Sequence, residues 1–189
     1  MILTIYYKMR TSYNNTDLTY GDFLNGITMI KAPKKIVEIG ILDGYSLECF
    51  ANSSNNNTQI NAYDLFEEFN GNHSNKTELI KKFATFKNVK IEHGDFYKLH
   101  LNIEYDIDII HIDIANNGDV FEYAIQNYLP KLAENGILLL EGGSIERDNV
   151  AWMNKYNKPK INPVIQKHFN NNINIQVIGS FPSITIIKK

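Results

Sequence analysis

The stretch that most constrains this chain is Lys35–Phe50, where a short apolar run passes through two glycines into a helical pattern. Residues 35–39 are rich in β-branched side chains, Gly40 and Gly44 follow, and residues 46–51 have the character of a helix. Glycine lets a backbone approach a ligand closely, and a helix N-terminus presents unpaired N–H groups. Such a turn is typical of the ligand-binding edge of an α/β sheet.

The spacing of these glycines excludes two common nucleotide-binding motifs. A dinucleotide-binding turn has glycines at i, i+2 and i+5, but Leu42 and Tyr45 stand at those positions counted from Gly40. A phosphate loop ending in Gly-Lys-Ser or Gly-Lys-Thr is also absent. The pattern that remains is an acid, Glu38, followed by Gly40 and Gly44, and the alternative interpretation is an ordinary tight strand-to-helix turn.

Length and charge narrow the class of protein. A chain of 189 residues suits one domain with a full core, which we expect to span residues 1–189 with 1–20 as an extension. A formal net charge of −2 gives no overall nucleic-acid signature. The single cysteine, Cys49, cannot form an internal disulfide and is expected to pack in the core. With no signal-peptide pattern and no membrane-spanning run, we expect a cytoplasmic protein.

Acidic residues recur where the following strands should end. Residues 59–64 end in Asp64, which in a Rossmann-like sheet would reach ribose hydroxyls, with a helix N-cap as the alternative. Residues 89–96 end in Gly94-Asp95-Phe96. In residues 105–113, His111 and Asp113 share one face because residues two apart in a strand point the same way. Asp113 should lie at the carboxyl edge, and His111 is best interpreted as a core histidine.

Periodicity predicts the rest of the elements. An apolar strand at 137–141 follows the Asn135-Gly136 turn and ends in Glu141, and residues 145–162 should form a loop or lid near an acceptor. Further elements are expected as helices at 20–31, 76–87, 120–129 and 162–170, and as a closing hairpin of strands at 173–178 and 183–187.

Taken in order, these motifs resemble the class I S-adenosylmethionine (SAM) dependent methyltransferases over residues 20–187. The resemblance implies an α/β, Rossmann-like fold with a mostly parallel seven-stranded sheet, a C-terminal antiparallel hairpin and strand order 3-2-1-4-5-7-6. The segment Tyr63-Asp-Leu-Phe-Glu67 looks like that of macrocin-type O-methyltransferases. By resemblance, Phe96 would stack on adenine, although a core position is an equal alternative. The cofactor-binding residues that it implies are Glu38, Gly40, Gly44, Ser46, Asp64, Leu65, Asp95, Phe96 and Asp113.

The reaction implied by the resemblance is transfer of a methyl group from the sulfonium of SAM to a hydroxyl oxygen. Asp113 is the candidate general base, or the group that orients the acceptor, and Glu141 is the second carboxylate. Pairing of the two acids would raise one pKa toward neutrality. The alternative is that both acids only cap the segments that follow them. Metal-dependent relatives carry more ligands at these two strand ends. Ala115 and Gly142 replace them here, so Mg²⁺ on the two carboxylates is a less favoured alternative and no firm metal site is expected.

The expected acceptor is a small molecule such as a sugar, a polyketide or a phenol. The alternative function is a methyltransferase-like domain that binds SAM or a nucleoside without catalysis. Neither nucleic acid nor membrane is an expected partner, since lysines near the C-terminus are interpreted as a solvated face. A homodimer is the default expectation for the assembly.

Overall fold

The computed structural model describes residues 4–5, 19–69, 71–179 and 182–189. Most of the N-terminal extension, and part of the predicted turn between the last two strands, lie outside the described residues. Within these ranges, no helix is long and apolar enough to cross a membrane.

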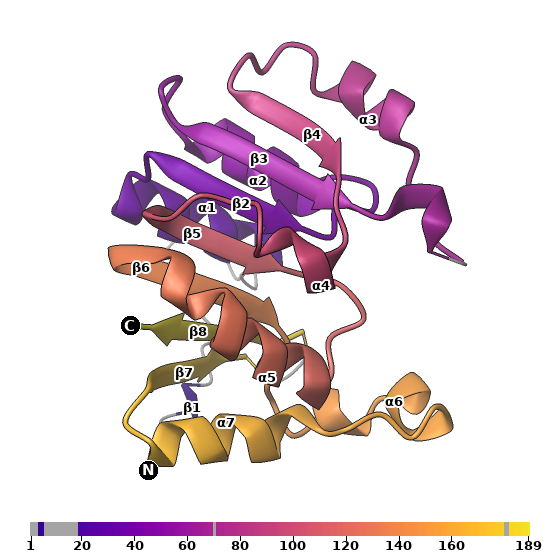
Figure 1. The fold of residues 1–189 in the computed structure, drawn as a ribbon, viewed down its shortest axis with the longest axis vertical. Coiled ribbons are helices and arrows are strands. Elements are labelled where there is room, and N and C mark those ends of the chain that lie inside the picture. Colours follow the sequence, from indigo (N-terminus) through magenta and orange to yellow (C-terminus); the bar gives the residue numbers. More distant parts are fainter. Residues whose placement is uncertain (1–3, 6–18, 70, 180–181) are drawn as a thin grey trace, which may run out of the picture.

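One twisted sheet of eight strands runs through the molecule, in the order β1-β7-β8-β6-β5-β2-β3-β4 (Figure 1). The strands are β1 (Thr4–Ile5), β2 (Lys35–Ile39), β3 (Gln59–Asp64), β4 (Val89–His93), β5 (Ile107–Ile112), β6 (Leu132–Glu141), β7 (Asn174–Ile178) and β8 (Ile184–Lys188). The seven strands from β2 to β8 follow the predicted order, which is confirmed. Strand β1 adds an eighth, parallel to β7 at the edge of the sheet.

Only β8 runs against its neighbours: it pairs antiparallel with β6 and with β7, whereas the other pairs are parallel. The reversal follows from the short connection between β7 and β8, which has no room for a crossover helix. The predicted antiparallel C-terminal hairpin is therefore confirmed.

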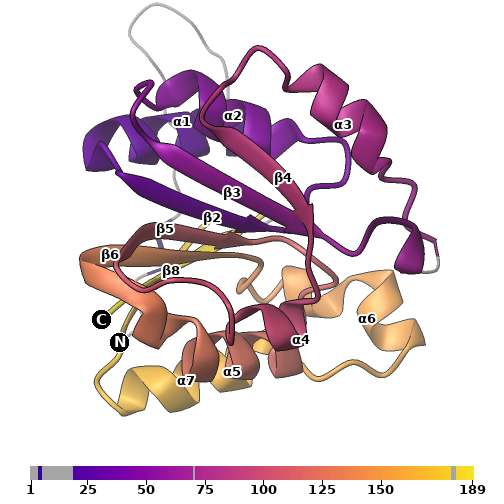
Figure 2. The same ribbon diagram turned by 45° about the horizontal axis from the view of Figure 1, so that its top comes forward.

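Helices cover the sheet on both faces (Figure 2). One face carries α1 (Tyr20–Lys31), α2 (Tyr45–Ser53) and α3 (Lys76–Lys82), and the other carries α4 (Phe96–Leu99), α5 (Gly118–Asn127) and α7 (Ile161–Asn170). Alternation along β5 serves both cores: Ile109 packs with Leu24 and Phe50 on the α1–α2 face, while Ile110 packs with Phe121 on the α5 face. The strands are consequently fixed on both sides, and their carboxyl ends form a rigid edge.

Several elements differ from the sequence predictions. Residues 145–162, expected as a loop or lid, contain the short helix α6 (Ala151–Lys155) and the start of α7. The helix expected at 76–87 ends at Lys82, because Phe83 and Phe86 leave the helix and pack together, with ring centroids 5.9 Å apart. The turn expected at Asn135-Gly136 lies inside β6 instead. A register shift opposite residues 107–109 absorbs it, and Gly136 passes so close to β5 that an added Cβ would lie 2.6 Å from the carbonyl oxygen of Ile107.

Candidate functional site

The two glycines of the turn after β2 allow the chain to approach itself. Gly40 has φ +92°, and a Cβ there would lie 2.0 Å from the carbonyl oxygen of Asp113. Gly44 has φ +81° at the N-terminus of α2, and a Cβ there would lie 2.8 Å from the Phe83 ring. Both positions therefore require glycine on backbone and packing grounds. The close passage of Gly40 joins the turn to the end of β5.

A buried carboxylate lies beneath this turn. Glu38 is fully buried, and its Oε1 accepts a hydrogen bond from the Ser46 hydroxyl, which is presented by the first turn of α2. Nδ1 of His111 lies 3.3 Å from the same oxygen, without the alignment of a good hydrogen bond. Oε2 has no partner. Since a buried carboxylate oxygen without a donor is costly, this atom marks a place where a positive group would be stabilised.

Tyr20, the first residue of α1, contacts the same cluster through its hydroxyl group. Its hydroxyl lies 2.9 Å from Nε2 of His111, on the ring nitrogen opposite Glu38. Burial raises the pKa of Tyr20, and the nearby Asp113, Glu141 and Glu38 charges raise it further, so the hydroxyl stays protonated. The sequence analysis placed His111 in the core, and it is fully buried. Tyr20 was not predicted as a site residue, because the sequence indicated only that it begins the helix expected at 20–31.

Asp113 and Glu141 lie side by side at the ends of β5 and β6. They directly follow Ile112 and Leu140, which pair in register. The side chain of Asp113 is open to solvent, yet the protein packed around it raises its pKa to about 6. The neighbouring Glu141 and Glu38 charges act in the same direction, while His111 and Arg147 oppose it. Asp113 is therefore an accessible carboxylate whose pKa lies just below neutrality.

Glu141 is held by Arg147, a partner that the sequence analysis missed. Nε of Arg147 donates to Oε1 at 2.7 Å, and Nη2 donates to Oε2 at 2.8 Å, so the guanidinium grips both carboxylate oxygens. Nη2 also donates to the carbonyl oxygen of Asn116 at 3.2 Å. Glu141 was expected to be the second carboxylate of the site, beside Asp113. In the structure this acid is neutralised by an ion pair that is largely shielded from water.

Asp64 holds the glycine turn in place. Its Oδ2 accepts from the backbone N–H groups of Ile41 and Leu42, at 2.7 and 3.2 Å. Its Oδ1 accepts from the N–H of Phe66 at 2.8 Å and from the side-chain amide of Asn72 at 2.7 Å. With four donors on two oxygens, a ribose would have to compete with existing bonds. A helix N-cap, the alternative interpretation of Asp64, does not account for all of these hydrogen bonds, since the carboxylate joins three separate segments.

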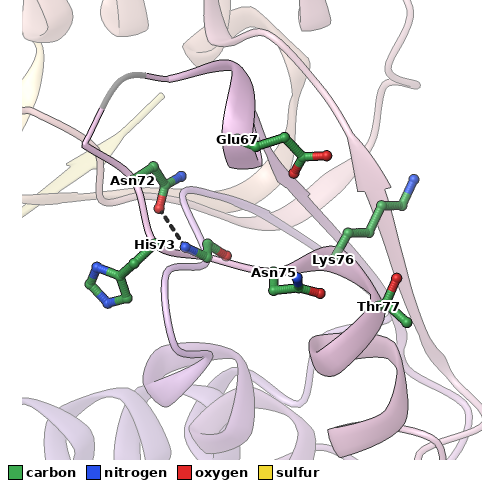
Figure 3. A pocket seen from close by; sticks show the side chains of 7 residues that line it. Glu67, Asn72, His73, Asn75, Lys76 and Thr77 are labelled. Carbon is green, nitrogen blue, oxygen red and sulfur yellow. Dashed lines mark hydrogen bonds between the residues drawn. The ribbon is translucent and has the colours of Figure 1, made fainter.

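A polar hollow of about 280 Å³ opens beside Asn72, between the loop after β3 and the start of α3. Figure 3 shows the side chains around it, and Asn72 also accepts a hydrogen bond from the N–H of Ser74. Leu65, an expected cofactor contact, is half-buried at the start of this loop. The lining residues are Glu67, Asn72, His73, Ser74, Asn75, Lys76 and Thr77.

The residues after β4 begin next to the end of β3, where the N–H of Gly94 donates to the carbonyl oxygen of Asp64 at 3.0 Å. Asp95 caps α4 by accepting from the N–H of Tyr97 at 2.9 Å, and it pairs with Lys98 at 3.2 Å. Phe96 is buried in the α5-side core, where its ring stacks on Tyr128 at a centroid distance of 5.3 Å. For Phe96 the structure therefore favours the core alternative over the expected stacking on adenine, because its ring already has a stacking partner.

The donor set of this edge does not suit a firmly bound metal. Across the part of the chain that the structure describes, no three His, Cys, Asp or Glu side chains converge as metal ligands. The oxygens of Glu141 that would serve such an ion already accept from Arg147. Asp113 alone remains, and one carboxylate seldom holds a divalent cation.

Comparisons with known proteins agree with this geometry. A family model described as a methyltransferase domain matches residues 37–141, which span β2 to β6. No curated protein matches the sequence.

Similar folds occur among solved structures. A putative O-methyltransferase from Klebsiella pneumoniae has a TM-score of 0.69 and 15% identity, covering 91% of this chain and 81% of its own. An O-methyltransferase from Bacillus cereus in complex with SAH has a TM-score of 0.63 and 18% identity, covering 92% of this chain and 83% of its own. A putative rRNA-methylase from Clostridium thermocellum has a TM-score of 0.66 and 12% identity, over 92% and 97%. At these identities the likeness concerns the fold.

Proposed function

This chain belongs to the methyltransferase domain family, and from that premise we propose that it transfers a methyl group from SAM to an oxygen of a small-molecule acceptor. The observation that carries the proposal is the grouping of Glu38, Asp113 and Tyr20 around one glycine turn. Three polar groups from β2, β5 and α1 meet at the carboxyl edge of the sheet, where α/β folds bind their ligands.

The residues present fit the charged end of the cofactor. The unpartnered Oε2 of Glu38 supplies negative charge, and the N-terminus of α2 supplies backbone N–H groups close by. SAM carries an ammonium and a carboxylate at this end, so the two features are complementary to it. A nucleoside would extend toward Leu65 and the hollow next to Asn72. In this arrangement Asp64 acts by holding the turn in shape.

Bound SAM would supply a methyl carbon attached to a positively charged sulfur. The chain's part is to align the acceptor and to take its proton. Asp113 is suited to the second task, since it is accessible and, with a pKa raised to about 6, is ionised yet basic near neutral pH. Tyr20 stays protonated beside it and can donate a hydrogen bond, while His111 holds its hydroxyl in place.

Two observations support oxygen as the acceptor atom: the position of Asp113 and the similarity of the fold to solved O-methyltransferase structures. A hydroxyl must lose a proton on methylation, and a carboxylate at the reacting edge meets that need. Two of the structures reported above are called O-methyltransferases, one of them putative. A macrocin-type acceptor, or another sugar, polyketide or phenol, is consistent with the Asp64–Glu67 segment.

Calorimetric titration with SAM and SAH tests the first half of the proposal. We expect binding of both, weakened in Glu38→Gln and unchanged in Glu48→Gln, an exposed acid on the outer side of α2 that pairs with Lys82. Absence of heat with both ligands in the folded protein would refute a SAM-dependent function. A screen for SAH release with pooled hydroxyl acceptors then tests transfer itself.

A second candidate is a domain that binds SAM without turnover. The observation that favours it is the ion pair between Glu141 and Arg147, which leaves Asp113 as the only free carboxylate of the predicted catalytic pair. Two results together would favour this candidate over the enzyme. The protein would bind SAM, with an affinity that Asp113→Asn does not change, and it would release no SAH with phenolic, sugar or polyketide pools.

A further inference from the structure

Arg147 lies in a short turn after β6 whose backbone is fixed by hydrogen bonds on both sides. Two left-handed glycines, Gly142 and Gly143 with φ +102° and +114°, turn the chain back over the end of β6. The backbone N–H of Arg147 donates to the Ser144 hydroxyl at 3.1 Å. The next residue, Asp148, accepts from the N–H groups of Ile161 and Asn162, at 2.6 and 2.8 Å, at the start of α7. The short turn that carries Arg147 is therefore anchored at both ends.

The side chain of Arg147 uses space that a glycine provides. A Cβ on Gly142 would lie 3.3 Å from Cγ of Arg147, a distance tighter than ordinary contact. The guanidinium then lies with its central carbon 5.3 Å from the centre of the Trp152 ring, at the start of α6 (Ala151–Lys155). Gly142 is also one of the positions at which the sequence departs from the metal-dependent pattern. The glycine at position 142 therefore both removes a metal ligand and leaves room for the side chain of Arg147.

The guanidinium performs the electrostatic task of a cation between two strand ends. It binds Glu141 through Nε and Nη2, and it binds the segment between β5 and α5 through the carbonyl oxygen of Asn116. The positive charge of Arg147 also acts to lower the pKa of Asp113, which neighbours Glu141 at the end of the adjacent strand. Nη1 is buried and has no hydrogen-bond partner within the described ranges of the chain, so one end of the guanidinium still lacks an oxygen there.

We propose that Arg147 is the resident cation of this edge and takes the place between the Asp113 and Glu141 carboxylates that a divalent metal would otherwise occupy. Methyl transfer at this site then needs no metal ion. The inference rests on the proposed function only in assigning Arg147 to the same site, because the cation's place can be tested without cofactor or acceptor.

The experiment is a titration of Mn²⁺, followed by the loss of its free-ion electron paramagnetic resonance signal. The protein carrying Arg147 should leave the signal of free Mn²⁺ unchanged. Arg147→Met keeps an unbranched apolar stem beside Gly142 but frees the Glu141 carboxylate next to Asp113, so we expect it to bind Mn²⁺ at least about tenfold more tightly. Arg147→Met combined with Glu141→Gln should lose the new site.

Controls separate a specific site from a general change of charge. Lys155→Met removes an exposed positive charge from α6 without touching Glu141, and it should bind no more Mn²⁺ than the unaltered protein. Arg147→Lys keeps the charge and should also leave free Mn²⁺ unchanged, which provides a test if Arg147→Met does not fold.

Either of two results would overturn the inference. One is stoichiometric Mn²⁺ binding by the unaltered protein that Asp113→Asn abolishes. The other is an Arg147→Met variant with an unchanged circular dichroism spectrum and no gain of Mn²⁺ binding. Failure of SAM binding would refute the proposed function and leave this result standing, so the two outcomes are distinguishable.

Discussion

The hydroxyl of Tyr20 lies 2.9 Å from Nε2 of His111, joining the first residue of α1 to the buried centre of β5. On the other side of the imidazole, Nδ1 of His111 lies 3.3 Å from Glu38. A helix that precedes the glycine turn in sequence is thus attached to the polar cluster beneath that turn. We therefore expect a displacement of α1 to change the contacts of His111 and Glu38 beneath the glycine turn.

Tyr20→Phe should destabilise the protein by about 1–2 kcal/mol, because it leaves a fully buried imidazole nitrogen without a partner. Denaturant unfolding measures the change. Tyr45→Phe, at an exposed tyrosine on the first turn of α2, is the matched control and should change the free energy of unfolding by less than about 0.5 kcal/mol. Equal effects in the two variants would contradict a specific role for the Tyr20 hydroxyl.

Glu38→Gln should weaken SAM binding by about tenfold to a hundredfold, because the ammonium of the ligand loses a buried negative partner. The amide keeps the volume of the side chain, and Ser46 can still donate to its oxygen. Titration calorimetry measures the affinity, and circular dichroism checks the fold. A variant that binds SAM as tightly as the parent protein would rule out Glu38 as the anionic contact.

The rate of methyl transfer should rise as the pH passes about 6, because Asp113 must be ionised to accept a proton. SAH release measured from pH 5 to 8 reports this, and Asp113→Asn should abolish the rise along with most of the activity. A flat profile over this range in the active protein would remove Asp113 as the base.

Stability should show the opposite dependence on pH. Folding raises the pKa of Asp113 above its unfolded value of 3.8, so its contribution to stability is present below pH 4 and is lost as pH rises through about 6. Asp113→Asn should therefore raise the melting temperature more at pH 7.5 than at pH 4.5. Asp119→Asn, an exposed acid in the first turn of α5, serves as the control and should show no such gain at pH 7.5.

Gly40→Ala should destabilise the protein by several kcal/mol or prevent folding, because its Cβ would overlap the carbonyl oxygen of Asp113 at a positive φ. Gly26→Ala is the paired control. It lies in α1 with no atom within 4 Å of the added Cβ, so it should stabilise by about 0.5–1 kcal/mol. Thermal unfolding of both variants would settle the point, and similar melting temperatures would contradict the close approach.

The sequence by itself determined the order of most helices and strands along the chain. Glycines at 40 and 44 follow a β-rich run, and alternating or continuous apolar strands recur between helical patterns. These are local signals, since burial periodicity and turn chemistry are set by neighbouring residues. They were enough to predict the strands along the chain, the closing hairpin, and the position of Asp113 and Glu141 at strand ends. The order of the strands within the sheet was implied by the resemblance to class I methyltransferases.

Only the tertiary structure decided which side chains meet at that edge. Tyr20 and His111 are 91 positions apart, and the sequence has no local pattern that pairs them. Arg147 stands in what the sequence shows only as a polar loop, and two left-handed glycines are needed to turn it onto Glu141. Whether a carboxylate is free, paired or saturated depends on donors brought from other elements, and a one-dimensional pattern does not contain that information.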